Sequence, residues 1–156
     1  MRELFLKNKF EANGISFKER FGVNIPFSSE NIELEYNSVR NAVGLSDFSF
    51  LHKYTIPEDT GLDFLNNLFA GNVENLRFGK VLHTFLADDE GNVISDCYIA
   101  NNDEEFLVLC ESVVDQAEMD KILFDENNGG EYGLKNISDD YVVLSIDGSN
   151  AWRAAK

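Results

Sequence analysis

Basic residues, cysteine, proline and long apolar runs are all scarce in this chain of 156 residues, and each scarcity excludes a class of protein. Only 13 Lys and Arg stand against 28 Asp and Glu, and the net charge of -15 argues against a nucleic-acid-binding surface. No apolar run is long enough to cross a bilayer. The first residues, MRELFLKNKFEANG, lack the continuous apolar segment of a secretory signal. We therefore expect a cytoplasmic protein that acts on neither nucleic acid nor membrane.

The chain has two cysteines, Cys97 and Cys110, and they are not spaced as a metal-binding or redox pair. No second pair of metal-ligating residues accompanies them. This arrangement favours two small buried residues on strands over metal ligands or nucleophiles, and it suits a reducing compartment. The sequence predicts no metal site.

Acidic residues are concentrated in the second half of the chain. Residues 1–80 hold nine Lys or Arg and eleven Asp or Glu, whereas residues 81–156 hold four and seventeen. One interpretation is a solvated acidic face that maintains solubility. The other is an acidic surface that docks on a basic partner or on a basic domain elsewhere.

The length and the hydrophobic content of 44% suit one domain with one core. Strand patterns alternate with helix patterns, which indicates an α+β fold with antiparallel sheets and packed helices. The predicted elements are an extended segment Phe21–Phe27, a helix from a cap at Ser28 or Ser29 to Gly44, a strand Leu45–Ile56 ended by Pro57, a helix Gly61–Ala70, strands Val81–Ala87 and Val93–Asn101 joined by the turn Asp88–Asn92, a strand Phe106–Cys110, a helix capped by Asp115 and reaching Phe124, and a strand Tyr141–Ile146.

A last helix is predicted after the turn at Asp147–Ser149, with Ser149 as its N-cap. Its amphipathic pattern begins at Ala151, and the sequence ends at Lys156. Two turns of helix are marginal without packing. We therefore expect this sequence to be the N-terminal part of a larger multidomain fold.

No complete catalytic motif is present, and His52 and His83 are isolated in the sequence. Asp96 is the most informative acidic residue, because strand alternation places it between apolar neighbours on Val93–Asn101. The same alternation puts Ser95 and Cys97 on the opposite face with Val93 and Ile99. Spacing alone favours an ordinary aspartate at a strand edge over a site residue. His83 lies on the partner strand, within reach of the same region.

Arg40 and Asp47 form a second pair of charged residues around the end of the first long helix. Arg40 one turn before the helix end is favourable with the helix dipole. Asp47 can accept hydrogen bonds from local backbone. The sequence predicts a structural role for both.

Glu35–Ser49 resembles a signature of the glycine-cleavage T-protein (aminomethyltransferase) family, approximately E-x-x-A-V-R-x-x-V-G-L-x-D-x-S. Ser38 replaces the usual alanine, and the matching positions are Glu35, Val39, Arg40, Val43, Gly44, Leu45, Asp47 and Ser49. A second block matches at Phe64, Leu65, Leu68, Val73, Leu76 and Gly79, with Gly71-Asn72 where Asn-Asp is usual. A third block, a Gly-Gly turn followed by an aspartate, matches at Gly91, Ile94 and Asp96. Asn92 replaces the second glycine, and Ser95 replaces the first of two aspartates. A weak fourth block keeps Gly148 and Ala151.

The resemblance covers residues from about Gly14 onward and implies one N-terminal aminomethyltransferase-like folate-binding domain over residues 1–156. It implies tetrahydrofolate as cofactor and transfer of an aminomethyl group from the lipoyl arm of a carrier such as H-protein. It makes Asp96 the candidate catalytic residue, beside the folate nitrogens, where a carboxylate stabilises developing positive charge. The candidate cofactor-binding residues are Asp96, His83, Tyr98, Leu109 and Cys110.

Two of the candidate cofactor-binding residues depart from the family pattern: His83 stands where a tyrosine is common, and Cys110 where an asparagine is common. The alternatives on the same scaffold are a tetrahydrofolate-dependent demethylase or methyltransferase, a non-catalytic folate-binding module that pairs with a second chain, and an iron–sulfur-assembly relative. The motif of that last branch, K-G-C-Y-x-G-Q-E, is absent from this sequence.

Overall fold

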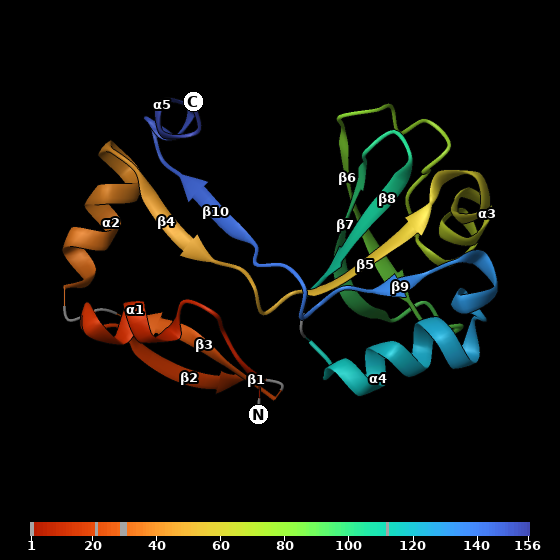
Figure 1. The fold of residues 1–156 in the computed structure, drawn as a ribbon, viewed down its shortest axis with the longest axis horizontal. Coiled ribbons are helices and arrows are strands. Elements are labelled where there is room, and N and C mark those ends of the chain that lie inside the picture. Colours follow the sequence, from red (N-terminus) through yellow and green to blue (C-terminus); the bar gives the residue numbers. More distant parts are fainter. Residues whose placement is uncertain (1, 21, 29–30, 112) are drawn as a thin grey trace. The chain divides into compact units, whose positions relative to one another are not determined.

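The computed structural model describes residues 2–20, 22–28, 31–111 and 113–156. The fold is α+β, as predicted, and it divides into two compact units (Figure 1). One unit is Leu51–Asp140. The other combines Met1–Phe50 with Tyr141–Lys156. The assignment of residues 1–156 to one folate-binding domain stays a prediction.

Leu51–Asp140 is built on a five-stranded antiparallel sheet with the strand order β6-β7-β8-β5-β9. The strands are β5 (His52–Pro57), β6 (Val81–Ala87), β7 (Val93–Asn101), β8 (Glu105–Cys110) and β9 (Lys135–Asn136). The predicted hairpin of β6 and β7 is confirmed with its bounds unchanged. Pro57 ends β5 as expected.

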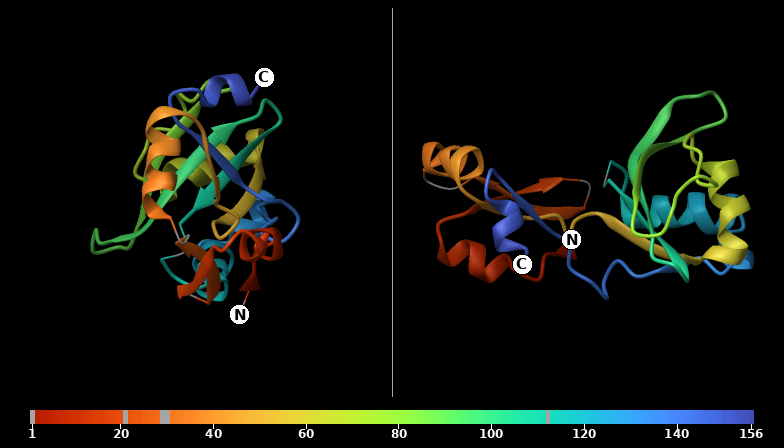
Figure 2. Two further views of the ribbon diagram at one scale, coloured as in Figure 1. Left: turned by 90° about the vertical axis from the view of Figure 1, so that its left-hand side faces the viewer. Right: turned by 90° about the horizontal axis from the view of Figure 1, so that it is seen from above.

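One face of this sheet is covered by α3 (Glu58–Leu68), α4 (Gln116–Asp120) and the π-helical segment Lys121–Glu126 that continues α4 (Figure 2). The predicted cap of α4 is confirmed, because the Asp115 side chain accepts a hydrogen bond from the backbone N–H of Glu118 at 2.9 Å. Burial of this face supplies the main hydrophobic stabilisation of the unit. The core contains Tyr54, Ile56, Phe64, Leu65, Phe69, Cys97, Ile99, Phe106, Val108, Cys110, Met119 and Leu123.

The second unit holds a three-stranded sheet, β1-β3-β2, and a two-stranded antiparallel sheet, β10-β4. Its strands are β1 (Arg2–Glu3), β2 (Ser16–Arg20), β3 (Val23–Ser28), β4 (Gly44–Asp47) and β10 (Leu144–Asp147). Its helices are α1 (Lys7–Ala12), α2 (Ile32–Asn41) and α5 (Ala151–Ala154). None of α1, β1 and β2 was predicted from the sequence.

The prediction of one strand over Leu45–Ile56 is wrong. The chain forms β4 and β5 instead, separated by the segment 48–51, and the two strands belong to different units. The rings of Phe48 and Phe50 lie 5.4 Å apart between centroids in that break, with their planes tilted by 32°. A continuous apolar pattern does not reveal a break of this kind, because it records burial and not the direction of the backbone.

Several element boundaries also differ from the prediction. α3 covers Glu58–Leu68 and not Gly61–Ala70, and β10 covers Leu144–Asp147 and not Tyr141–Ile146. α2 is capped by the Asn31 side chain, which accepts from the backbone N–H of Leu34, while Ser28 lies in β3 and Ser29 lies outside the described residues. α2 ends at Asn41 and not at Gly44. α5 is preceded by Asn150 and not by Ser149. Side-chain capping groups are dense in both regions, so the sequence alone does not select one.

The extended segment predicted over Phe21–Phe27 forms strand β3 from Val23 onward, while Phe21 lies outside the described residues. Proline is tolerated there because, among the described residues, β1 pairs with Val23 and Asn24 and not with Pro26. On the other side, the register with β2 shifts between Ser16 and Phe17. Within the described residues, no helix has the length and apolar character that a membrane span requires.

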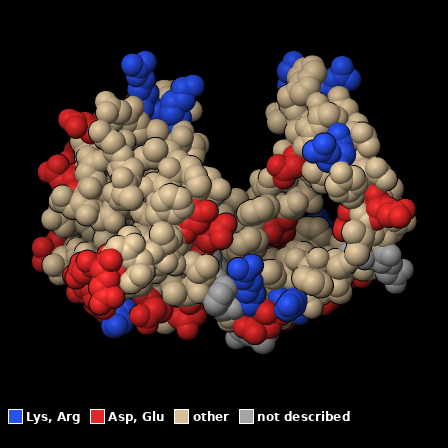
Figure 3. Space-filling model, turned by 180° about the vertical axis from the view of Figure 1, so that it is seen from behind, with Lys and Arg blue, Asp and Glu red and all other residues tan. Residues whose placement is uncertain are grey.

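The net charge of -15 belongs entirely to Leu51–Asp140. This unit holds five Lys or Arg and twenty Asp or Glu, and the other unit holds eight of each. Figure 3 shows acidic side chains spread over its surface. The predicted imbalance of charge therefore follows the division into units more closely than the division into sequence halves.

At Gly61 in α3, side-chain packing reverses the usual preference of a helix for alanine over glycine. Alanine normally favours a helix over glycine by about 1 kcal/mol. A Cβ at Gly61, however, would lie 2.8 Å from both γ carbons of Ile56. We expect Gly61→Ala to lower the free energy of unfolding by about 1–3 kcal/mol in urea titration. Gly130→Ala is the matched control, because its Cβ would meet only Phe124 at 3.9 Å. Equal stability of both variants would contradict this packing account.

Candidate functional site

The candidate site lies on the face of the five-stranded sheet opposite its helices. Strand pairing puts His83 of β6 opposite Tyr98 of β7, and Tyr98 opposite Leu109 of β8. Asp96 lies two residues from Tyr98 on the same strand, so its side chain is on the same face. The structure thus brings four of the five predicted site residues together: His83, Asp96, Tyr98 and Leu109.

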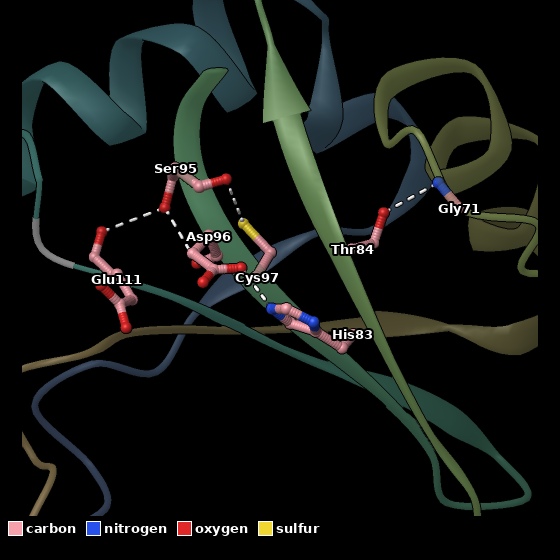
Figure 4. Close-up of polar contacts among 7 residues, drawn as sticks. All are labelled: Gly71, His83, Thr84, Ser95, Asp96, Cys97 and Glu111. Carbon is pink, nitrogen blue, oxygen red and sulfur yellow. Dashed lines mark hydrogen bonds and ion pairs between the residues drawn. The ribbon is translucent and has the colours of Figure 1, made fainter.

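His83 and Asp96 form the central polar contact of this face. The imidazole Nε2–H donates to Oδ1 of Asp96 at 2.5 Å, diagonally across the β6–β7 pair. Figure 4 shows the two side chains pointing toward one another from neighbouring strands. Their side chains are 51% and 37% exposed. Oδ2 of Asp96 has no hydrogen-bond partner among the described residues, so this oxygen is available to a ligand.

Aromatic rings surround the His83 imidazole. The ring of Tyr98 stacks on it with centroids 4.9 Å apart and planes inclined by 27°. Phe85 meets it edge-on at 5.5 Å. Phe85 was not among the predicted site residues, although strand alternation from His83 places it on the same face, directly opposite Asp96. The face therefore offers planar apolar surface beside a carboxylate oxygen.

The backbone at Asp96 is fixed from the neighbouring strand. Its carbonyl accepts from the backbone N–H of Glu111 at 2.9 Å. It also accepts from the Ser95 hydroxyl at 3.1 Å (Figure 4). Ser95 is buried, on the face opposite Asp96 that strand alternation predicts. Val93, predicted on the same face as Ser95, is exposed, and the register of β6 and β7 shifts beside it, between Leu86 and Ala87.

The turn before β7 explains one departure from the family pattern. Asp88 accepts hydrogen bonds from the backbone N–H of Asn92 at 2.8 Å and from its side-chain amide at 2.9 Å. These bonds lower the pKa of Asp88. Gly91 has a φ of +84°, which glycine adopts without strain. Asn92, in place of a second glycine, thus closes the turn that leads the chain toward Asp96.

Cys110 lies apart from the other predicted site residues. It is buried on the core face of β8, directly opposite Cys97 of β7. Its thiol donates to Cys97, and this hydrogen bond together with burial raises the pKa of Cys110 well above its ordinary value. Both residues are the free, buried strand cysteines that the sequence predicts. Among the described residues, no group of side chains could hold a metal ion.

A second polar cluster lies around the buried side chains of β5 and was not predicted. The hydroxyl of Tyr54 donates to Oδ1 of Asp120 at 2.8 Å and accepts from the amide of Gln116 at 2.7 Å. The ring of His52 lies between Gln116 Oε1, at 2.8 Å, and the carbonyl of Val114, at 2.9 Å. His52 and Tyr54 are fully buried. These contacts tie β5 to the start of α4, which is a structural role.

The predicted local roles of Arg40 and Asp47 are confirmed in the other unit. Arg40 lies in the last turn of α2. Oδ1 of Asp47 accepts from the backbone N–H of Ser49 at 2.8 Å. Asp47 is 5% exposed, and its Oδ2 has no partner among the described residues.

Comparison with known proteins identifies the family to which this α+β fold belongs. The family model "GCVT N-terminal domain" matches residues 6–155. The chain belongs to this family.

Aminomethyltransferases are among the relatives of this chain. One from Thermoanaerobacter sp. (strain X514) is 30% identical over 146 residues, covering 94% of this chain and 39% of that protein. One from Caldanaerobacter subterraneus subsp. tengcongensis is 32% identical, covering 92% and 37%. The chain thus spans about two fifths of the length of the curated relatives that it matches.

The fold is also found in a solved structure. The crystal structure of glycine cleavage system aminomethyltransferase T from Bartonella henselae matches with a TM-score of 0.76 and 18% identity. The match covers 96% of this chain and 41% of that chain. At this identity, the likeness establishes the fold alone.

The Tyr54 cluster generates a prediction for alkaline pH. Burial, followed by the hydrogen bond to Asp120, raises the pKa of Tyr54 far above its ordinary value. The folded state therefore keeps a proton that the unfolded chain releases above pH ~10. We expect this residue to reduce the free energy of unfolding by about 1.4 kcal/mol per pH unit above that point.

Urea unfolding between pH 8 and 11 measures this effect. Tyr54→Phe should show a shallower loss of stability with rising pH than the parent chain, while the exposed Tyr141→Phe should match the parent. Parallel curves for the parent chain and Tyr54→Phe would refute the assignment.

Proposed function

We propose that this chain forms the folate-binding part of a tetrahydrofolate-dependent aminomethyltransferase of the glycine-cleavage type, acting in the cytoplasm. The observation that carries the proposal is the partly exposed Asp96 carboxylate, whose Oδ1 is held by His83, with the rings of Tyr98 and Phe85 against the His83 imidazole. The identity of the relatives as aminomethyltransferases supports the reaction class.

The open face suits a flat, nitrogen-bearing ring such as a reduced pterin. The exposed side of the Tyr98 and Phe85 rings offers apolar contact to a planar ligand. The free Asp96 oxygen accepts a hydrogen bond from a ring N–H. Leu109, next to Tyr98 on the sheet, extends the apolar surface. The residues present therefore fit the ring of tetrahydrofolate.

The anionic tail of the cofactor needs a different surface. Leu51–Asp140 carries twenty acidic and five basic residues, so it repels a glutamate tail. We expect basic side chains from the remaining three fifths of the family architecture to receive that tail. This expectation favours a functional enzyme that includes a C-terminal portion or a second chain.

The roles that we assign to Asp96 are hydrogen bonding and the stabilisation of charge. Bound tetrahydrofolate supplies the nitrogen atoms that accept the one-carbon unit. The Asp96 carboxylate orients those nitrogens by hydrogen bonding and stabilises positive charge that develops near them. The donor that we propose is an aminomethyl group on a lipoyl carrier. His83, in place of the common tyrosine, also favours testing a methyl donor, as in a demethylase.

Isothermal titration with tetrahydrofolate tests the proposal. We expect binding by this chain or by a full-length version, and we expect Asp96→Asn to weaken it roughly 10- to 100-fold, because a charge-assisted hydrogen bond is lost. In the full-length version, turnover should fall far more than the free energy of unfolding.

Asp89→Asn is the matched control, since it makes the same change of charge in the adjoining turn, where Asp89 is exposed. Its affinity for tetrahydrofolate should equal that of the parent chain. Absence of binding by both the short and the full-length chain would refute the proposal, and equal losses of turnover and stability in Asp96→Asn would make Asp96 a structural residue.

A further inference from the structure

We infer that His83 is a positioning residue that holds Oδ1 of Asp96 and thereby presents Oδ2 to the ligand. This inference rests on the proposed function and adds a role for a residue that departs from the family pattern. It comes from the geometry of one hydrogen bond and of the rings around it.

The contact between His83 and Asp96 is not imposed by strand pairing. The direct cross-strand partner of Asp96 is Phe85, and that of His83 is Tyr98. The hydrogen bond instead runs diagonally and requires each side chain to lean toward the other. Without it, a carboxylate that is 37% exposed is free to exchange between rotamers. The bond therefore selects one orientation of Asp96.

Both ends of this bond are fixed by other contacts. The His83 ring stacks on Tyr98 at 4.9 Å and meets the edge of Phe85 at 5.5 Å, so its rotation is restricted. The Asp96 backbone is fixed by Glu111 of the neighbouring strand end. A donor that is already oriented loses little entropy when the bond forms. The arrangement thus orients the carboxylate before a ligand arrives.

Fixing Oδ1 determines what a ligand meets. A carboxylate has about four acceptor positions, and His83 uses one of them. Among the described residues, none donates to Oδ2, so this oxygen remains open on the sheet face. A ligand N–H that bonds to Oδ2 finds an acceptor of fixed direction. A tyrosine at position 83 would place its donor at the end of a longer ring, so the histidine sets the orientation of Asp96 in this chain.

Two substitutions at position 83 separate the hydrogen bond from the ring. His83→Phe keeps a ring that can stack on Tyr98 but has no N–H. His83→Gln loses the ring but keeps an N–H donor at a similar reach. We expect His83→Phe to weaken tetrahydrofolate binding about tenfold, the value of one hydrogen bond to a charged group. His83→Gln should restore most of that affinity. Both should unfold like the parent chain, because His83 is half-exposed.

Nitrogen NMR of the histidine rings gives a readout that needs no ligand. The chain has two histidines, and His52 is buried in the Tyr54 cluster, so it serves as an internal reference. In Asp96→Asn, the ring signals of His83 should shift and those of His52 should not. Unchanged His83 signals would overturn the inference.

The outcomes distinguish this inference from the proposed function. Tetrahydrofolate binding that is equal in His83→Phe and the parent chain would overturn the positioning role and leave the proposed function intact. Loss of affinity in His83→Gln with full affinity in His83→Phe would assign the role to the ring and overturn the inference. Absence of binding by both this chain and a full-length version would refute the proposed function and with it the presentation of Oδ2. The NMR shift would still report the hydrogen bond.

Discussion

The register of β6, β7 and β8 is the constraint on which the candidate site depends. Antiparallel pairing places Cys97 opposite Cys110 and Tyr98 opposite Leu109, and a shift of one residue would exchange the two faces. The buried thiols and the helices over them therefore fix the position of Asp96, although they lie on the other side of the sheet. The core and the open face are two results of the same pairing.

Prediction from sequence worked best where local signals agreed. The turn at Asp88–Asn92 and the alternation of the flanking strands defined the β6–β7 hairpin, and they placed Asp96 and His83 on one region of it. The pairing of their side chains could not be predicted, because a diagonal contact depends on rotamers and on the rings of Tyr98 and Phe85. Cys110 shows the opposite case. The family resemblance made it a candidate cofactor-binding residue, whereas strand alternation alone places it on the core face.

The errors arose where distant parts of the chain determine the structure. Leu45–Ile56 looks continuous, but β4 pairs with β10 near the end of the chain and β5 pairs with β8. Neither partner is visible in a local window of residues. The Tyr54 cluster was missed for the same reason, because Gln116 and Asp120 lie more than sixty residues away from Tyr54. Local sequence patterns record which residues are buried. The direction of the strands and the contacts between distant residues depend on long-range pairing.

The discontinuity of the unit that combines Met1–Phe50 with Tyr141–Lys156 has a consequence for folding order. β4 is made early in synthesis, but its partner β10 follows only after the whole of Leu51–Asp140. That intervening unit is contiguous and has its own core, so it can fold while the ribosome is still adding residues. Its folding also brings the two ends of this ninety-residue segment close together before β4 and β10 pair. The acidic unit that carries the candidate site thus acts as an internal scaffold for assembly of the neutral unit.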